Sequence, residues 1–150
     1  MDYNELVQKK TKSRIIYKPN KQLKAIIGDY MLESATLSNK IIKSLGIDTI
    51  IVSSPEDIFE LVKEGNKVDF IITNNLYNNS KYDGFQIAYH LKIILNYEKP
   101  LIVLTSSYNQ DYYFLHKCGF DGYLTKPLEI EKARETVLKL IPDLKFIKID

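Results

Sequence analysis

The sequence predicts an α/β fold with a doubly wound, five-stranded parallel sheet and helices on both faces. From residue 24 onward, short β-branched runs alternate with helical patterns, which is typical of a parallel sheet with crossover helices. The runs at residues 50–52 and 70–72 are apolar without alternation, as expected for strands covered on both faces. An exposed antiparallel sheet would instead alternate apolar and polar side chains.

Each element has its own signals along the chain. The five predicted strands are residues 24–28, 48–52, 68–73, 100–105 and 122–125. Ser54 and Pro55 are typical of an N-cap and a first helical position, so a helix is expected to follow them. A helix beginning near residue 106 or 107 is expected to end before Gly119, and the helix at 129–141 is expected to end before Pro142. The remaining predicted helices cover the apolar stripe before Gly46 and residues 85–95.

Length and composition bound the domain organisation. A chain of 150 residues with 45% hydrophobic content can bury one core without disulfides or metals. The single cysteine, Cys118, cannot form an intramolecular disulfide, and the sequence has neither a leader pattern nor a long apolar run. These features predict a location in the reducing cytoplasm and no membrane insertion.

The charge is distributed unevenly. Residues 1–24 carry seven basic and two acidic side chains, a net charge of +5, so the total of +2 leaves −3 for the remaining residues. We therefore expect a basic N-terminal arm or linker at residues 1–23, a globular domain at 24–142 and a C-terminal tail at 143–150. The mildly acidic domain lacks the broad basic surface of a nucleic-acid-binding module, so nucleic acid is not an expected partner.

Four polar side chains follow or end different strands of the predicted sheet: Asp29, Asn74, Thr105 and Lys126. The carboxyl ends of parallel strands meet at one edge, where ligands of such sheets bind. Any one of these residues alone is a weak signal, because acids and hydroxyls after strands usually cap helices. Their coincidence predicts a shared pocket.

With these residues in place, the chain from about residue 24 to 141 resembles the receiver domain of bacterial two-component response regulators. The specific motifs are Leu104-Thr105-Ser106, the run from Gly119 to Lys126-Pro127, and Asp83-Gly84. The resemblance implies a flavodoxin-like fold in which an aspartate after the third strand is phosphorylated with the help of magnesium. It also implies a cis Lys126-Pro127 bond.

The resemblance also assigns roles to the predicted pocket. It implies that Asp29 is the first member of an acidic pair and that Asn74 occupies the phosphoacceptor position. Thr105 and Tyr123 match the hydroxyl and the aromatic that report activation, and Lys126 matches the lysine that contacts the phosphoryl group.

The departures from the family pattern fall on the chemistry. Tyr30 replaces the second acid, Asn74 replaces the phosphoacceptor, and the loop at residues 75–82 is longer than usual. A carboxamide cannot form an acyl phosphate. Because magnesium prefers anionic oxygen ligands, we expect its binding to be weak or absent, with no resident cofactor and no enzymatic turnover. Lys126 then has two roles open to it: a contact with Asp29 and Asn74 that fixes one state, or exposure to solvent.

The predicted function is that of a pseudo-receiver signalling domain acting through phosphorylation-independent protein–protein contacts. The partner is expected to be a kinase, a regulator or an output domain, and a homodimer is a further use of the same surface. By resemblance, that surface lies on the fourth and fifth helices, with the candidate residues Tyr112, Tyr113, His116, Glu131, Arg134 and Glu135. Two alternatives stay open: a phosphorylatable receiver that uses another acceptor, for which Asp69 and Asp83 are poorly placed, and a small-ligand-sensing α/β domain.

Overall fold

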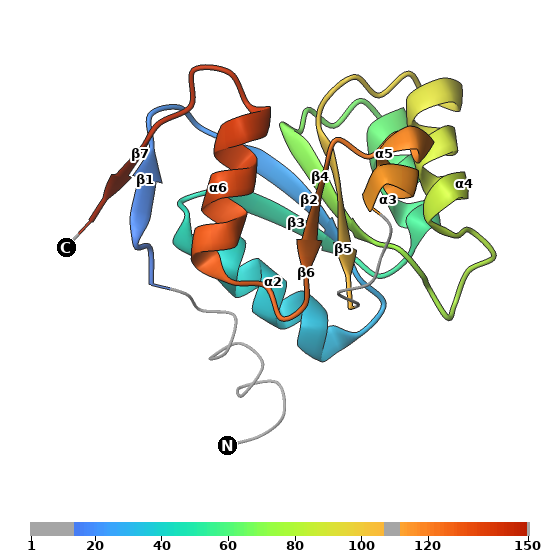
Figure 1. The fold of residues 1–150 in the computed structure, drawn as a ribbon, viewed down its shortest axis with the longest axis horizontal. Helices are drawn as coiled ribbons and strands as arrows, with labels where there is room; N and C mark the ends of the chain where they lie inside the picture. Colours follow the sequence, from blue (N-terminus) through green and yellow to red (C-terminus); the bar gives the residue numbers. More distant parts are fainter. Residues whose placement is uncertain (1–13, 107–111, 150) are drawn as a thin grey trace.

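The computed structural model describes residues 14–106 and 112–149, and its centre is a five-stranded parallel sheet (Figure 1). The strands are β2 (Lys24–Gly28), β3 (Asp48–Val52), β4 (Phe70–Asn74), β5 (Leu101–Thr105) and β6 (Gly122–Thr125). Their order across the sheet is β3-β2-β4-β5-β6, and every neighbouring pair is parallel. The predicted fold class is confirmed, and the predicted strand at 68–73 begins later and extends to Asn74.

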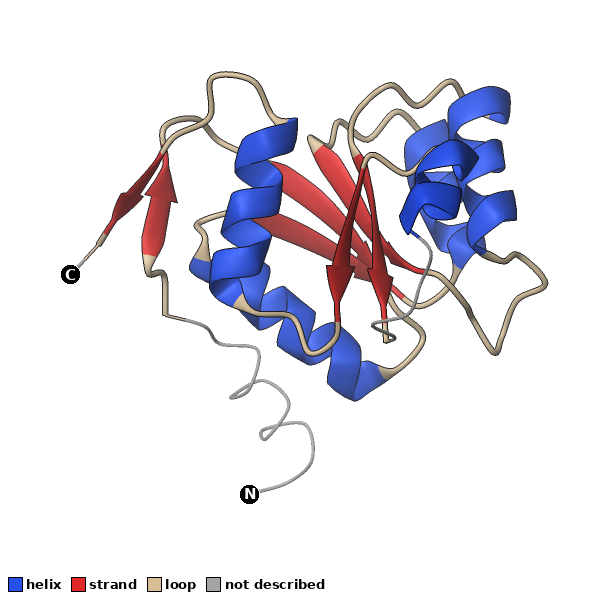
Figure 2. Ribbon diagram, in the orientation of Figure 1, coloured by secondary structure: helices blue, strands red, loops and turns tan. Residues whose placement is uncertain are grey.

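Helices cover both faces of the sheet (Figure 2). On one face, α2 (Leu32–Ser44) and α6 (Ile130–Leu140) bury side chains such as Ile42 and Val137 against the sheet. On the other face lie α3 (Pro55–Lys63), α4 (Gly84–Tyr89) with its π-helical continuation η1 (His90–Ile94), and α5 (Tyr112–Cys118). The sheet is thus enclosed by two apolar layers, which explains why its central strands read as unbroken apolar runs.

The helix boundaries follow local chemistry. The Ser54 hydroxyl accepts a hydrogen bond from the Asp57 backbone N–H at 3.2 Å and so caps α3. Asp83 and Gln86 form a reciprocal capping box at the start of α4. Gly119 follows α5 at a φ of 119°, a conformation that favours glycine. The predicted start of this helix at residue 106 or 107 falls next to residues 107–111, which lie outside the described part of the chain.

A second, two-stranded antiparallel sheet joins the two ends of the described chain, from segments that the sequence analysis placed in the arm and the tail. Strand β1 (Tyr17–Pro19) pairs with β7 (Phe146–Lys148), so that Tyr17 lies opposite Lys148. Tyr17, Leu23 and Leu144 are buried in the same apolar layer as α2 and α6. The described parts of the predicted arm and tail therefore belong to the folded unit. Their backbones pair as β1 and β7, and their apolar side chains are buried in the same core as α2 and α6.

Within the described residues, no helix is long and apolar enough to cross a membrane.

Candidate functional site

The structure brings the predicted pocket residues to the carboxyl edge of the sheet. Asp29 follows β2, Asn74 ends β4 and Thr105 ends β5, and each is buried, with 2–3% of its surface exposed. Lys126 follows β6, where its backbone N–H donates to the Thr105 carbonyl at 2.7 Å. The Lys126-Pro127 bond is cis, as the resemblance implied.

Asp29 is the centre of the polar contacts at this edge. Its Oδ1 accepts hydrogen bonds from the Asn74 side-chain amide at 2.8 Å and from the Met31 backbone N–H at 3.0 Å. Its Oδ2 lies 3.3 Å from the Lys126 ammonium. Of the two roles open to Lys126, the structure shows the contact with Asp29. A buried carboxylate is costly unless it is paired and hydrogen-bonded, and these three groups supply both kinds of partner.

Two oxygens at the edge remain without a hydrogen bond among the described residues. They are Asp29 Oδ2, whose contact with Lys126 is an ion pair without hydrogen-bond geometry, and Asn74 Oδ1. The Asn74 side chain thus uses its amide N–H, and not its oxygen, in the contact with Asp29. An aspartate in its place could not donate in the same way when ionised.

The donor set does not fit magnesium. Asp29 is the only carboxylate of the four edge residues, and it is already engaged by an amide and an ammonium. Across the described ranges, no group of three or more His, Cys, Asp or Glu side chains could hold a metal ion. Tyr30 is half-buried, and its ring centroid lies 6.1 Å from that of Tyr77. A tyrosine at this position does not supply the carboxylate oxygen that magnesium prefers.

Tyr77, from the loop between β4 and α4, is a residue that the sequence reasoning placed only in general terms around the pocket. Its buried hydroxyl lies 2.8 Å from the Thr73 hydroxyl, and burial raises its pKa well above the usual value. The hydroxyl fits because residue 28 is glycine: a Cβ there would lie 2.5 Å from it. The sequence alone shows only a large aromatic side chain shortly after a predicted strand, and the contact with Gly28 is visible only in the structure.

The other acids considered as acceptors have structural roles elsewhere. Asp69 accepts from the Lys24 backbone N–H at 2.8 Å, at the opposite end of β4 from Asn74. Asp83 accepts from the Gln86 backbone N–H at 2.9 Å as the cap of α4. Neither carboxylate belongs to the set of contacts around Asp29.

The predicted interaction surface contains a groove of about 600 Å³ between α5, β6 and α6. Its lining includes Tyr112 and Glu135 from the predicted set, together with Tyr123, Lys126, Glu129, Lys132 and Lys139. The Tyr112 and Tyr123 rings lie 4.2 Å apart and form an aromatic wall at one end. The Lys126 side chain contacts both this groove and Asp29, so the groove adjoins the pocket.

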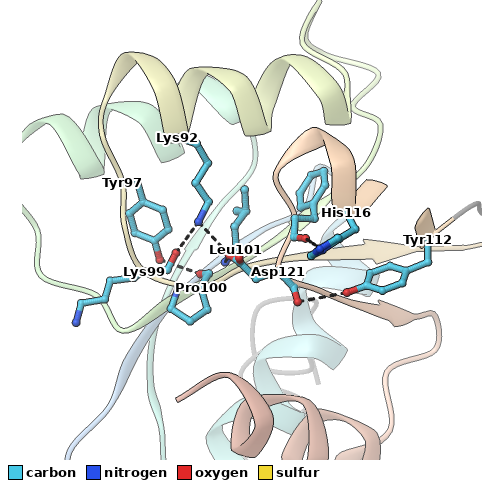
Figure 3. Close-up of polar contacts among 9 residues, drawn as sticks. Lys92, Tyr97, Lys99, Pro100, Leu101, Tyr112, His116 and Asp121 are labelled. Carbon is cyan, nitrogen blue, oxygen red and sulfur yellow. Dashed lines mark hydrogen bonds and ion pairs between the residues drawn. The ribbon is translucent and has the colours of Figure 1, made fainter. Parts of the chain in front are cut away.

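Figure 3 shows the polar contacts around Asp121, in the loop between α5 and β6. Asp121 accepts hydrogen bonds from the Leu101 backbone N–H at 2.8 Å and from the Lys92 ammonium at 2.9 Å. The Tyr112 hydroxyl donates to the Asp121 carbonyl at 3.3 Å, and His116 Nδ1 lies 3.0 Å from the Phe120 carbonyl. Tyr112 and His116 therefore help to hold α5 in place.

The remaining predicted surface residues have other surroundings. Tyr113 is exposed, and the Lys117 ammonium lies 4.5 Å from its ring centroid. The charges of Glu131 and Arg134 are paired with each other within the chain. The Arg134 guanidinium donates to Glu131 at 2.8 Å and lies 5.3 Å from the centre of the Tyr17 ring.

Tyr17 completes this arrangement. Its hydroxyl donates to Glu131 Oε1 at 2.5 Å, which is the main cause of the raised pKa of Tyr17 and of the lowered pKa of Glu131. We call β1, β7, Glu131 and Arg134 the terminal clasp. Sequence reasoning missed it because Tyr17 and Glu131 are far apart in the chain.

Comparisons with known proteins agree with this fold. No family model matches the sequence. The structure is similar to the receiver domain of a Francisella response regulator, with 24% identity, a TM-score of 0.68, and coverage of 79% of this chain and 96% of that one. It is also similar to a Vibrio cholerae chemotaxis response regulator, with 15% identity, a TM-score of 0.69, and coverage of 81% and 100%.

A third similar structure is the receiver domain of a Pseudomonas aeruginosa sensor histidine kinase, which holds a magnesium ion in its active-site cleft. Its identity is 16% and its TM-score 0.69, with coverage of 80% of this chain and 98% of that one. The fold is therefore that of response-regulator receiver domains. Likeness at these identities concerns the fold, and the chemistry has to be argued from the residues at the edge of the sheet.

Proposed function

We propose that this chain is a pseudo-receiver, a signalling domain that acts through protein–protein contacts without aspartyl phosphorylation and without enzymatic turnover. One observation carries the proposal: the residue that ends β4 is Asn74, and its amide donates to Asp29 at 2.8 Å. An amide at this position lacks the nucleophilic carboxylate that forms an acyl phosphate. The hydrogen bond gives it a different task, the stabilisation of the remaining acid.

The contact between Lys126 and Asp29 supports a fixed conformation. In this pocket the ammonium has one carboxylate to pair with, at 3.3 Å, and Asp29 has no exposed side-chain surface. A phosphoryl group is not needed to supply a negative charge for Lys126. We therefore expect one stable arrangement of Thr105 and Tyr123, set by the sequence.

The groove between α5, β6 and α6 is the proposed partner site, for a kinase, a regulator or an output domain. Its aromatic wall of Tyr112 and Tyr123 and its mixed lysines and glutamates match the combination of aromatic anchors and polar rim found at specific interfaces. Similar structures come from response regulators and from a sensor histidine kinase, which is consistent with this class of partner.

The test is treatment of the purified chain with acetyl phosphate and magnesium, followed by intact-mass measurement. We expect no added phosphoryl group, because neither Asn74 nor Tyr30 offers a carboxylate. A stable addition, localised by tandem mass spectrometry, would instead support the alternative of another acceptor. The matched control is a receiver domain with an intact aspartate under identical conditions, which shows that the phosphodonor is active.

A further inference from the structure

The two-stranded sheet formed by β1 and β7 has one side against the core and one side facing away from it. Tyr17 is buried and Phe146 is half-buried, with their ring centroids 6.2 Å apart, so these two side chains mark the inner side. Successive side chains of a strand point to opposite sides, and residues paired across an antiparallel ladder share a side. Lys18 is paired with Ile147, and both therefore lie on the outer side. Both are exposed, Ile147 to 66%.

The pairing continues past the ends of both strands and adds two side chains to the outer side. The Asn20 backbone N–H donates to the Lys145 carbonyl at 2.9 Å, and the Ile149 backbone N–H donates to the Ile16 carbonyl at 2.7 Å. Lys145 and Ile149 lie two residues to either side of Ile147 and so share its side. Lys145 is exposed, and Ile149 is 43% exposed. The outer clasp face is the name we give to Lys18, Lys145, Ile147 and Ile149.

The segments that form this sheet are basic, whereas the segment between them is acidic. Residues 14–24 and 141–149 carry six basic side chains and one acidic side chain, a net charge of +5. Residues 25–140 carry 12 basic and 15 acidic side chains, a net charge of −3. Much of the positive charge is therefore held on one folded corner of the molecule, where β1 and β7 lie in Figure 1. Such a separation of charge turns the basic corner toward an anionic surface.

The apolar members of the outer clasp face indicate which anionic partner fits. Ile147 and Ile149 are aliphatic, and Ile15, which precedes β1, is 54% exposed. Proteins that bind single-stranded nucleic acid combine basic side chains with aromatic rings that stack on bases, and none of the four residues of this face is aromatic. Aliphatic side chains among lysines suit the headgroup region of an anionic bilayer, because the aliphatic groups enter the acyl boundary while the ammonium groups meet phosphates.

We propose that the outer clasp face is a membrane contact through which the domain lies on an anionic lipid surface. Contact of this kind reaches only the interface of the bilayer and needs no membrane-spanning helix. The face shares no residue with the groove between α5, β6 and α6. The inference therefore goes beyond the proposed function, and each can fail without the other.

Cosedimentation of the full chain with lipid vesicles tests the proposal. We expect binding to phosphatidylcholine vesicles that contain about one third phosphatidylserine, a decrease in that binding as salt is added, and no binding to pure phosphatidylcholine. Lys18→Glu combined with Lys145→Glu should lower the partition coefficient at least about tenfold, because one charge near the surface changes it roughly fivefold. The matched control is Lys63→Glu combined with Lys67→Glu, at two exposed positions in and after α3, which gives the same net charge and should change binding by less than about twofold.

A second pair of variants tests the apolar part of the contact. Ile147→Thr keeps a β-branched side chain but removes apolar surface, so it should lower the partition coefficient about threefold or more. The matched control is Ile93→Thr, the same change at a 59% exposed position on η1, which should leave binding unchanged. Circular dichroism and thermal unfolding show whether each variant is folded.

Three results would overturn the proposal. The first is no binding to the anionic vesicles at low salt and millimolar lipid, or equal losses in the two double variants, which would mean that net charge alone matters. The second is a loss of binding only when Lys9, Lys10 and Lys12 are neutralised, which would assign the contact to the N-terminal segment. The third is equally tight binding to an oligonucleotide that Ile147→Thr does not weaken, which would assign the face to nucleic acid.

Discussion

Asn74 determines how the polar groups at the carboxyl edge of the sheet are paired. Its amide is neutral and can donate a hydrogen bond, so it satisfies Asp29 without adding charge to a buried edge. Lys126 then balances the single carboxylate. The contacts among Asp29, Asn74 and Lys126 therefore form a small network with almost no net charge.

The first consequence is that Asn74→Asp, made alone, should destabilise the domain. It would replace a donor by a second carboxylate within 2.8 Å of Asp29, and like charges that share a buried site cost about 1–3 kcal/mol. Repulsion raises the pKa of the pair in the folded state, so the loss should be present at neutral pH and should shrink as the pH falls through that raised pKa. Urea unfolding at pH 7 and near pH 4 measures it.

Asn74→Ala is the control for that experiment. It removes the donor without adding a charge, so its loss of stability should not shrink as strongly on acidification. If Asn74→Asp is as stable as the wild type at pH 7, then Lys126 alone can neutralise both acids.

At the residue scale, the sequence predicted which side chains meet at the edge of the sheet, because each follows a strand whose direction the βα alternation determines. It left open where Lys126 would point, since that depends on side-chain packing. Tyr77 and the pairing of Glu131 with Tyr17 were not predicted, because they depend on contacts between segments whose distance in space a single sequence does not reveal.

Among the elements, the terminal clasp is built from segments to which the sequence analysis assigned no strand or helix. Gly46, which follows α2 with a φ of 77°, makes room for β1, since a Cβ at that position would lie 2.8 Å from the Tyr17 carbonyl oxygen. The two strands are three residues each, too short to be stable alone. Their stability depends on Tyr17 packing on α6 and bonding to Glu131.

The contribution of the terminal clasp to the free energy of unfolding should therefore depend on pH, and the Tyr17→Phe variant can measure this dependence. The lowered pKa of Glu131 means that its contribution is complete above the usual value of 4.5 and is lost as the pH falls through the folded value. The raised pKa of Tyr17 means that its contribution is complete below 10.0 and is lost as the pH rises through the folded value. The stability difference between wild type and Tyr17→Phe should be greatest between these limits.

Chemical denaturation across the pH range gives this difference. The control is Tyr113→Phe, at a 67% exposed ring, which should show no such dependence. A Tyr17→Phe difference that stays constant from pH 3 to pH 11 would mean that the hydroxyl contact contributes nothing beyond packing.

The five parallel strands and the helices between them could be predicted because each is marked locally, by apolar runs, caps and glycines. The pairing of β1 with β7 could not, because neither short run carries a signal that names its partner. The π-helical turn in η1 was also missed, since no residue type marks such turns reliably.

For the whole molecule, the clasp brings the two ends of the described chain to one corner of the fold, as Figure 1 shows. Tyr17 and Lys148 are directly opposed across a strand pair, so the path between the ends is short. The stability of the fold should then depend more on the arrangement of the elements in space than on their order along the chain. The fold should accept circular permutation.

A permuted chain in which residues 14 and 149 are joined by a short Gly/Ser linker, with new ends opened at the exposed Gly65 turn after α3, should fold to the same sheet. Gly65 is exposed and has no atom within 4 Å of an added Cβ, so opening the chain there removes no side-chain packing at that position. Circular dichroism and thermal unfolding would show whether the permuted chain folds. Loss of cooperative unfolding would contradict the prediction. By the same geometry, the domain can be accommodated as an insertion within a loop of another protein, entering and leaving through adjacent strands.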